Sequence, residues 1–337
     1  MLVTGGWLLA ALVISLLLVH FMIGYAYRRG LLDLPGRRRS HQQPTPRGGG
    51  IGIVMVMLSC APWVLSGTVS HGVVASWIAG LLLIAWIGWW DDHRPLQILP
   101  RLAVQVLAVS GFSAVLVHGG GSWWWLLLLM PAGVWSVNLH NFMDGIDGLL
   151  ALQSMFVACG LALLAWSIGQ PALALAAAMF MLAAFGFSIY NRPPARIFMG
   201  DVGSGSIGWI IFAFSAMLWR IDQVLIWPCL ILSSAFAVDA GLTLLSRMLR
   251  GRRWYAAHRE HLYQWLVRRG AAHAQVAWGY LAWNLLVVAP LAWLALIHPT
   301  AAIPLTMVAY VAAGVTWFVL KSRLVHRRLP KVPHAAA

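Results

Sequence analysis

Long apolar stretches separated by short polar loops make up most of the sequence. An α-helix needs about 20 mostly apolar residues to cross a bilayer core of about 30 Å. At that length, the pattern predicts about eleven membrane-spanning helices. The expected spans are residues 3–25, 50–67, 72–90, 102–118, 123–138, 149–168, 171–190, 205–219, 224–246, 276–297 and 301–320. We therefore expect an all-α integral membrane protein with a single polytopic membrane domain over residues 1–337.

The overall composition supports a membrane protein. Hydrophobic residues make up 61% of the chain and charged residues 9%, whereas soluble domains carry about 25% charged residues. A soluble core could not bury this much apolar surface. The three cysteines, Cys60, Cys159 and Cys229, stand singly within apolar runs and indicate neither a disulfide framework nor a metal site.

The net charge of +14 is distributed unevenly over the loops. If successive loops alternate between the two sides, one side receives residues 26–49, 91–101, 139–148, 191–204, 247–275 and the tail 321–337. Of the 23 Lys and Arg residues, only Arg220 falls on the other side. The positive-inside rule makes the basic side cytoplasmic, with the N-terminus outside and the C-terminus in the cytoplasm. The excess charge is therefore interpreted as a topology signal, and no nucleic-acid partner is expected.

Most of the nine acidic residues lie on the same predicted cytoplasmic side. They are Asp33, Asp91, Asp92, Asp144, Asp147, Asp201 and Glu260; Asp222 is external, and Asp239 alone lies within a span. Transporters tend to keep ionisable groups near the middle of the membrane. The gathering at one face favours an enzyme that takes a cytoplasmic substrate. A transporter is the competing class.

The adjacent pair Asp91-Asp92 ends the third expected span. Two neighbouring carboxylates repel each other, and the negative end of the helix dipole adds to the repulsion. A nearby cation would offset both effects. The alternative is a solvated pair that ends a helix beside Arg94.

The segment Asn141-Phe-Met-Asp144-Gly-Ile-Asp147-Gly148 is more specific. On a helix, Asp144 and Asp147 would share one face, and the glycines leave room for a phosphate or a neighbouring helix. The alternative is acidic capping of a membrane helix, for which one Asp would suffice.

A glycine-rich loop around Asp201 precedes the eighth expected span. Small residues with free N–H groups at a helix start form a phosphate cradle, and Mg²⁺ in nucleotide sites is held by one or two carboxylates together with phosphate oxygens. Asp201 is therefore the first candidate metal ligand. The alternative is a turn built for tight helix packing.

Two further loops are candidate binding surfaces. One runs from Arg37 through His41 to Gly50, and it either binds phosphate or anchors the chain to headgroups. The other, Arg247 to Arg269, contains His258-Arg259-Glu260-His261. Paired histidines beside Arg suit a nucleotide diphosphate, although a structural role or a metal is the alternative.

Six motifs in this order resemble the polyprenyl-phosphate N-acetylhexosamine-1-phosphate transferases, the membrane type of glycosyltransferase family 4, which includes phospho-MurNAc-pentapeptide translocase. The motifs are Pro44-Thr45 with Gly48-Gly49-Gly50, Asp91-Asp92, Asn141 to Gly148, Phe198-Met-Gly-Asp201-Val-Gly-Ser204, Asp239 before Arg247, and the His261 loop. The peptidoglycan and GlcNAc branches carry three histidines in the last loop. Here His261 is followed by Leu262-Tyr263-Gln264, which resembles the O-antigen-initiating branch.

The resemblance implies transfer of N-acetylhexosamine-1-phosphate from a UDP-amino sugar to undecaprenyl phosphate at the cytoplasmic face of a bacterial inner membrane. The products would be undecaprenyl-pyrophosphate-sugar and UMP, the start of O-antigen or a related surface glycan. Direct attack and a covalent aspartyl intermediate both remain open, as do the identity of the amino sugar and a homodimeric state.

The resemblance also implies residue roles. Asp91 or Asp92 would act on the lipid phosphate, and Asp201 with Asn141 would hold Mg²⁺, with Mn²⁺ as the alternative ion. The expected substrate-binding residues are Asp144, Asp147, Arg196, Arg259, His261, Thr45 and Gly49.

Overall fold

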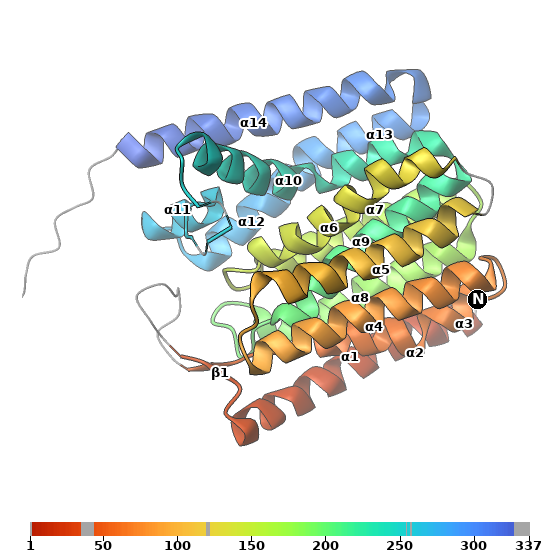
Figure 1. Cartoon of the computed structure of the whole chain (residues 1–337), viewed down its shortest axis with the longest axis horizontal. Coiled ribbons are helices and arrows are strands. Elements are labelled where there is room, and N and C mark those ends of the chain that lie inside the picture. Colours follow the sequence, from red (N-terminus) through yellow and green to blue (C-terminus); the bar gives the residue numbers. More distant parts are fainter. Residues whose placement is uncertain (1, 35–43, 119–121, 254, 257, 327–337) are drawn as a thin grey trace, which may run out of the picture.

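The computed structural model is a bundle of long helices packed side by side (Figure 1). It describes residues 2–34, 44–118, 122–253, 255–256 and 258–326. The predicted binding residues from Arg37 to His41 and the tail after residue 326 lie outside this range.

Helices account for nearly all of the regular structure. They are α1 (Leu2–Arg29), α2 (Ile51–Ser59), α3 (Ala61–Leu65), α4 (His71–His93), α5 (Ile98–His118), α6 (Leu126–Phe142), α7 (Leu149–Ser167), α8 (Pro171–Asn191), α9 (Asp201–Ile221), α10 (Ile226–Leu249), α11 (Leu262–Arg268), α12 (His273–Trp283), α13 (Ala289–Ile297) and α14 (Ala302–His326). A π-helical turn, Asn284–Val288, joins α12 to α13.

The all-α membrane class is confirmed. In the described part of the chain, nine helices are long and apolar enough to cross a membrane, with α12, the π turn and α13 forming one of them. The expected spans 50–67 and 123–138 hold shorter helices, the pair α2–α3 and α6. Pro62 stands at the start of α3, where its missing N–H costs no helical hydrogen bond.

Two helices extend a few residues beyond the expected spans and into the polar motifs. α4 continues through Asp91 and Asp92 to His93, and α9 already begins at Asp201. The Asp92 side chain at the end of α4 accepts hydrogen bonds from the first amides of α9. A hydropathy pattern does not detect such bonds. A two-residue antiparallel pair, β1 (Leu32–Asp33) with β2 (Thr45–Pro46), was also not predicted.

α9 is the central helix and is buried along almost its whole length. Apolar surface gives little driving force between helices within lipid, so close packing of small residues takes its place. On α9, Gly203 lies against Gly50 and Gly208 against the backbone of α6 at Ser136. The Ser136 hydroxyl donates to the Gly208 carbonyl at 2.7 Å. Tight helix packing, the alternative considered for the glycine-rich loop, is present at Gly203, and the predicted phosphate cradle stays a prediction.

The polar loops collect at one end of the bundle, which we call the basic end. α1, α4, α6, α8, α10 and α14 finish there, and α5, α7, α9 and α12 start there (Figure 1). The loops that the charge pattern assigns to one side therefore lie together at this end of the bundle. Arg220, near the end of α9, lies at the opposite end.

Replacing Gly208 by Ala tests the close approach of α9 and α6. A Cβ at this position would lie 2.4 Å from the Ser136 carbonyl oxygen. We expect Gly208→Ala to destabilise the detergent-solubilised protein by about 1–3 kcal/mol, the usual cost of overpacking, seen as a lower thermal midpoint. Gly111→Ala is the control because a Cβ there meets nothing within 4 Å; equal midpoints for the two variants would contradict the packing described.

Candidate active site

The carboxylate of Asp92 joins the end of α4 to the start of α9. Its Oδ1 accepts a hydrogen bond from the Asp201 N–H at 3.0 Å, and its Oδ2 accepts one from the Val202 N–H at 3.1 Å. The first amides of a helix have no partner within the helix and carry partial positive charge, so a carboxylate satisfies both needs. Gly200 precedes them at φ +77°, and a Cβ there would lie 2.6 Å from Asp92 Oδ2. Only glycine fits this turn.

Asp91 and Asp201 share one guanidinium group. Arg101 Nη1 lies 2.6 Å from Asp91 Oδ2 and 3.6 Å from Asp201 Oδ2. The other oxygen of Asp91 accepts the Leu96 N–H at 2.6 Å. The Asp201 side chain is 34% exposed and that of Asp91 only 7%. Asp201 is therefore the carboxylate of the pair that a ligand reaches more easily.

Asn141 completes the surroundings of Asp201. Its Nδ2 donates to Asp201 Oδ1 at 2.6 Å and to the Ser204 hydroxyl at 3.1 Å. The predicted proximity of Asn141 and Asp201, which lie sixty residues apart in sequence, is therefore present. The amide nitrogen faces these groups, so the amide oxygen remains available to a ligand.

The glycine run after β2 binds to the backbone that precedes α9. The Gly49 N–H donates to the Phe198 carbonyl and the Gly50 N–H to the Met199 carbonyl, both at 2.9 Å. A Cβ on Gly49 would lie 2.7 Å from the Phe187 ring. Thr45 is buried in β2. Both residues have structural roles here, and their predicted contact with substrate stays a prediction.

Asp144 lies close to Asp92 and Asp147. Burial, with the negative charges of those two residues, raises the pKa of Asp144 to about 8. A neutral carboxyl donates a hydrogen bond as well as accepting one. At neutral pH, Asp144 is thus suited to a polar, uncharged part of a ligand.

Asp147 occupies a different position from Asp144. Its Oδ2 accepts the Ala195 N–H at 3.1 Å and lies 3.3 Å from His273 Nδ1 of α12. The neighbouring Gly148 N–H donates to Asn191 Oδ1 at 2.9 Å. These bonds join the start of α7 to the α8–α9 connection and to α12. The expected sharing of one helix face by Asp144 and Asp147 was wrong, because α7 begins only at Leu149.

His261 is buried at the start of α11, beside the Asp144 segment. Its ring stacks on Phe142 at 6.3 Å and on Tyr263 at 5.8 Å, measured between ring centroids. Burial and the charges of Lys321 and Arg247 lower the pKa of His261, and Asp239 opposes this shift. A neutral imidazole suits hydrogen bonding to a sugar or a base better than charge pairing with a phosphate.

The two expected substrate-binding arginines, Arg196 and Arg259, contact Tyr190 and Arg268 respectively. Arg196 stacks over the Tyr190 ring, with its Cζ 5.5 Å from the centroid, and is exposed. The Arg259 carbonyl accepts a hydrogen bond from Arg268 at 3.4 Å. Neither contact leads to the carboxylates, so their substrate contacts stay predictions.

Two arginines that the sequence interpretation did not single out belong to the site. Arg101 holds Asp91 and Asp201, and Arg47 adds positive charge near Asp91 and Asp92. Arg101 fell in an expected loop that had been counted only for topology, and Arg47 fell in the Arg37–Gly50 loop, which had been considered as a whole for phosphate binding. Arg101 follows Asp92 by nine residues, across the connection between α4 and α5. This short separation is the signal in the sequence that could have identified Arg101.

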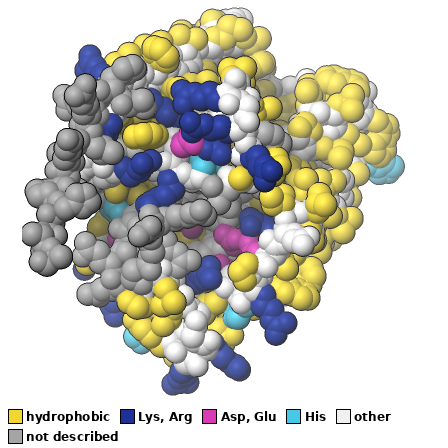
Figure 2. All heavy atoms as spheres, turned by 60° about the vertical axis from the view of Figure 1, so that its left-hand side comes forward, with side chains coloured by type: hydrophobic (Ala, Val, Ile, Leu, Met, Phe, Trp, Pro, Cys, Tyr) yellow, Lys and Arg dark blue, Asp and Glu magenta, His cyan; other side chains and the backbone are white. Residues whose placement is uncertain are grey.

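The electrostatics of the site fit a divalent cation shared with a ligand. Among the described residues, Arg101 lies beside Asp91 and Asp201, and the charge of Arg47 acts on Asp91 and Asp92. Within the described ranges, no three His, Cys, Asp or Glu side chains form a complete metal cage. Mg²⁺ typically takes one or two protein carboxylates and fills its shell with water and phosphate oxygens. Figure 2 shows Lys and Arg side chains around the acidic ones at this end.

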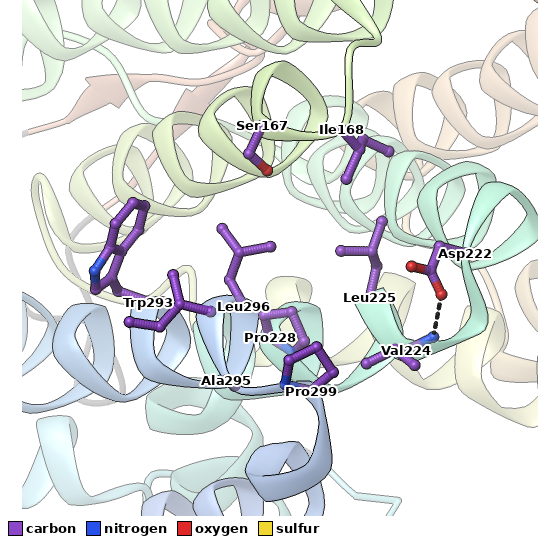
Figure 3. Close-up of a pocket in the computed structure, with 11 residues that line it drawn as sticks. Ser167, Ile168, Asp222, Val224, Leu225, Pro228, Trp293, Ala295, Leu296 and Pro299 are labelled. Carbon is purple, nitrogen blue, oxygen red and sulfur yellow. Dashed lines mark hydrogen bonds between the residues drawn. The ribbon is translucent and has the colours of Figure 1, made fainter.

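The opposite end of the bundle has a pocket of about 340 Å³ with a different character. Its lining is mostly apolar and includes Leu225, Pro228, Trp293 and Leu296 (Figure 3). The one carboxylate there, Asp222, accepts the Val224 N–H at 3.0 Å. Since α9 rises about 1.5 Å per residue over 21 residues, this pocket is remote from Asp201.

Asp144→Asn tests the environment of Asp144 through the pH dependence of stability. Because the folded-state pKa of about 8 lies above the usual 3.8, the wild-type protein loses stability as pH rises from about 4 to about 8. Asn cannot ionise. We expect the difference in thermal midpoint, variant minus wild type, to increase between pH 5 and pH 9, as followed by tryptophan fluorescence. A difference that stays constant over this range would contradict the raised pKa.

Comparisons with known proteins agree with this arrangement. Residues 74–219, which contain every carboxylate from Asp91 to Asp201, match glycosyl transferase family 4. The chain is 27% identical over 285 residues to the phospho-N-acetylmuramoyl-pentapeptide-transferase of Lactiplantibacillus plantarum, covering 75% of this chain and 87% of that protein.

Two further relatives carry a different sugar in their names. The probable undecaprenyl-phosphate N-acetylglucosaminyl 1-phosphate transferase of Bacillus subtilis is 27% identical, with 79% of each chain covered. The decaprenyl-phosphate N-acetylglucosaminephosphotransferase of Mycobacterium tuberculosis is 29% identical, with 86% of this chain and 82% of that protein covered. Residues 74–219 are therefore a glycosyl transferase family 4 domain, and they lie within a multi-pass membrane protein.

Proposed function

We propose that the protein transfers an N-acetylhexosamine-1-phosphate from a UDP-sugar to undecaprenyl phosphate. A lipid phosphate oxygen forms a bond to the phosphorus that carries the sugar, and the bond from that phosphorus to UMP breaks. The products are undecaprenyl-pyrophosphate-sugar and UMP. This reaction initiates O-antigen or a related surface glycan.

One observation carries the proposal. The carboxylates of Asp91, Asp92 and Asp201 and the Arg101 guanidinium come together at one end of a membrane bundle, from three different helices. Attack of one phosphate on another brings negative charges together, so the transition state needs preorganised positive charge. The relatives are named for transfers onto polyprenyl phosphates, which favours this chemistry.

The different contacts of the two neighbouring aspartates support different roles for them. Both oxygens of Asp92 accept α9 amides, so Asp92 positions the backbone of Asp201. Asp91 has one oxygen on Arg101, whose guanidinium also faces Asp201. We assign to Asp91 and Arg101 the contact with the attacking lipid phosphate, and to the more exposed Asp201 the contact with the cation.

Asp201 and the Asn141 amide oxygen would hold a Mg²⁺ or Mn²⁺ ion. Bound there, a divalent cation neutralises phosphate charge and orients the reacting groups. Asn141 fixes the Asp201 carboxylate through its Nδ2. Asp144, as a neutral hydrogen-bond donor, and His261 are assigned to the uridine or sugar of the donor.

The location follows from charge and from the acceptor. A cationic face attracts anionic nucleotide sugars, and the basic end also carries the carboxylate site. We place this end in the cytoplasm of a bacterium and the bundle in the inner membrane, where both substrates meet.

The reaction is tested with purified protein, undecaprenyl phosphate, Mg²⁺ and a panel of UDP-sugars, with UMP release as the measurement. We expect UMP with at least one UDP-N-acetylhexosamine and none with UDP-MurNAc-pentapeptide, because the last loop lacks the second and third histidines of that branch. Reactions without lipid phosphate are the control. Absence of UMP with every donor would reject the transferase and favour a transporter or flippase of lipid-linked sugars.

Asp201→Asn tests the assigned cation contact. We expect the turnover number to fall by about 100-fold or more, since a transition-state charge interaction is lost, while the thermal midpoint stays close to that of the wild type. Asp222→Asn, which changes a carboxylate at the far end of the same helix, is the matched control and should retain activity. Chelation should stop the wild-type reaction, and Mg²⁺ or Mn²⁺ should restore it. Full activity of Asp201→Asn with unchanged Mg²⁺ dependence would contradict the assignment.

A further inference from the structure

Asp239 of α10 is a buried carboxylate that lies outside the site described above. Five donors surround it. Its Oδ1 accepts from the Leu262 N–H at 2.7 Å, Trp317 Nε1 at 3.1 Å and the Thr243 hydroxyl at 3.4 Å, and its Oδ2 accepts from the Tyr280 hydroxyl at 2.7 Å and the Tyr263 N–H at 3.4 Å. The donors come from α10, α11, α12 and α14. Asp239 thus connects the C-terminal helices.

An ionisable side chain within a membrane span usually marks a transport pathway or a reactive site. Here, however, the five hydrogen-bond donors are enough to fill the roughly four acceptor positions of a carboxylate. The residue is only 2% exposed. This full set of partners argues for a fixed position rather than for proton transfer or ligand exchange.

Asp239 caps the start of α11 from another helix. Leu262 and Tyr263 are the first two residues of α11, and His261 is its N-cap. The His261 Nδ1 is buried with no hydrogen-bond partner among the described residues. Because Asp239 satisfies the first α11 amides, the His261 ring remains free for another role.

Tyr263 links the start of α11 to the segment that contains Asn141 and Asp144. Its hydroxyl donates to the Phe142 carbonyl at 3.0 Å. A Cβ on Gly145 would lie 2.1 Å from this hydroxyl, so the glycine makes room for the Tyr263 side chain. The segment that Tyr263 contacts also contains Asn141 and Asp144. The path from Asp239 therefore reaches the residues assigned to the cation and the donor.

α14 supports the same loop by a second route. Lys321 Nζ donates to the Glu260 carbonyl at 2.7 Å and lies 4.2 Å from the centroid of the Trp317 ring. The Glu260 carboxylate forms an ion pair with Arg247 of α10. The loop before α11 is thus held between α10 and α14, although most of α14 is exposed at the surface of the bundle.

We propose that Asp239 is a positioning residue for the UDP-sugar: it fixes the start of α11 so that His261 and Tyr263 hold the donor side of the site. The proposal rests on the proposed function. It assigns Asp239 no contact with substrate. Its effect should therefore appear in donor recognition and should pass through the α11 loop.

Asp239→Asn is the principal test because it keeps the size of the side chain but turns one acceptor into a donor that faces other donors. We expect the KM for the UDP-sugar to rise about tenfold or more, the range seen when a residue that orients a binding group is lost. The KM for undecaprenyl phosphate should change less than about twofold on the same reasoning. A purely structural role would lower the active fraction and leave both KM values unchanged, and that result, or an equal rise of both, would overturn the proposal.

A double-mutant cycle with His261→Ala tests the path. If Asp239 acts through α11, the effects of the two substitutions on the donor KM should be far from additive. Additive effects would overturn the proposal. Trp317→Phe removes one of the five donors and should have a smaller effect than Asp239→Asn, and Asp222→Asn should have none.

Hydrogen exchange gives a readout that does not depend on catalysis. In Asp239→Asn, the amides of residues 261–268 should lose protection while those of α9 keep it. Unchanged protection at α11 would overturn the proposal. If the wild-type protein releases no UMP from any donor, the proposed function fails as a separate result, and the exchange experiment still decides whether Asp239 fixes α11.

Discussion

The hydrogen bonds from the α9 amides to Asp92 are the interaction on which the site depends. They fix the end of α4 against the start of α9, and so they set the distance between Asp91 and Asp201. The close approach of Gly200 to the Asp92 carboxylate makes the same junction compact. Without it, two carboxylates on separate membrane helices would have no reason to share Arg101.

The bundle contains this kind of carboxylate cap at two helix starts. Asp92 satisfies the first amides of α9, and Asp239 satisfies the first amides of α11. In both cases a carboxylate on one helix caps the start of another helix, 109 residues away in sequence for Asp92 and 23 residues away for Asp239. Buried N–H groups at a helix start have no water to bond with, so a carboxylate from a neighbour stabilises both partners. The two capped helices carry Asp201 and His261, which we assign to the cation and the donor.

The site also depends on negative charge that it does not fully neutralise. Asp144 keeps a raised pKa because it is buried close to Asp92 and Asp147, and three further carboxylates face two arginines. Such a cluster opposes folding in the absence of a cation, a cost often found where a protein handles charged ligands. The close packing at the α9 glycines holds the helices together against this repulsion.

The sequence by itself determined the membrane class, the alternation of the loops and the end at which the acidic motifs gather, because hydropathy and charge act over whole segments. It also placed Asn141 beside Asp201 correctly, through the resemblance to a family. Only the tertiary structure decided which groups face each other. Arg101 pairs with Asp91, Asp147 turns toward His273, and Asp239 holds α11. Asp147 and His273 are 126 residues apart in sequence, whereas Asp91 and Arg101 lie on successive helices, as do Asp239 and Leu262. In each case the contact depends on how the helices pack, which the sequence pattern of one helix does not specify.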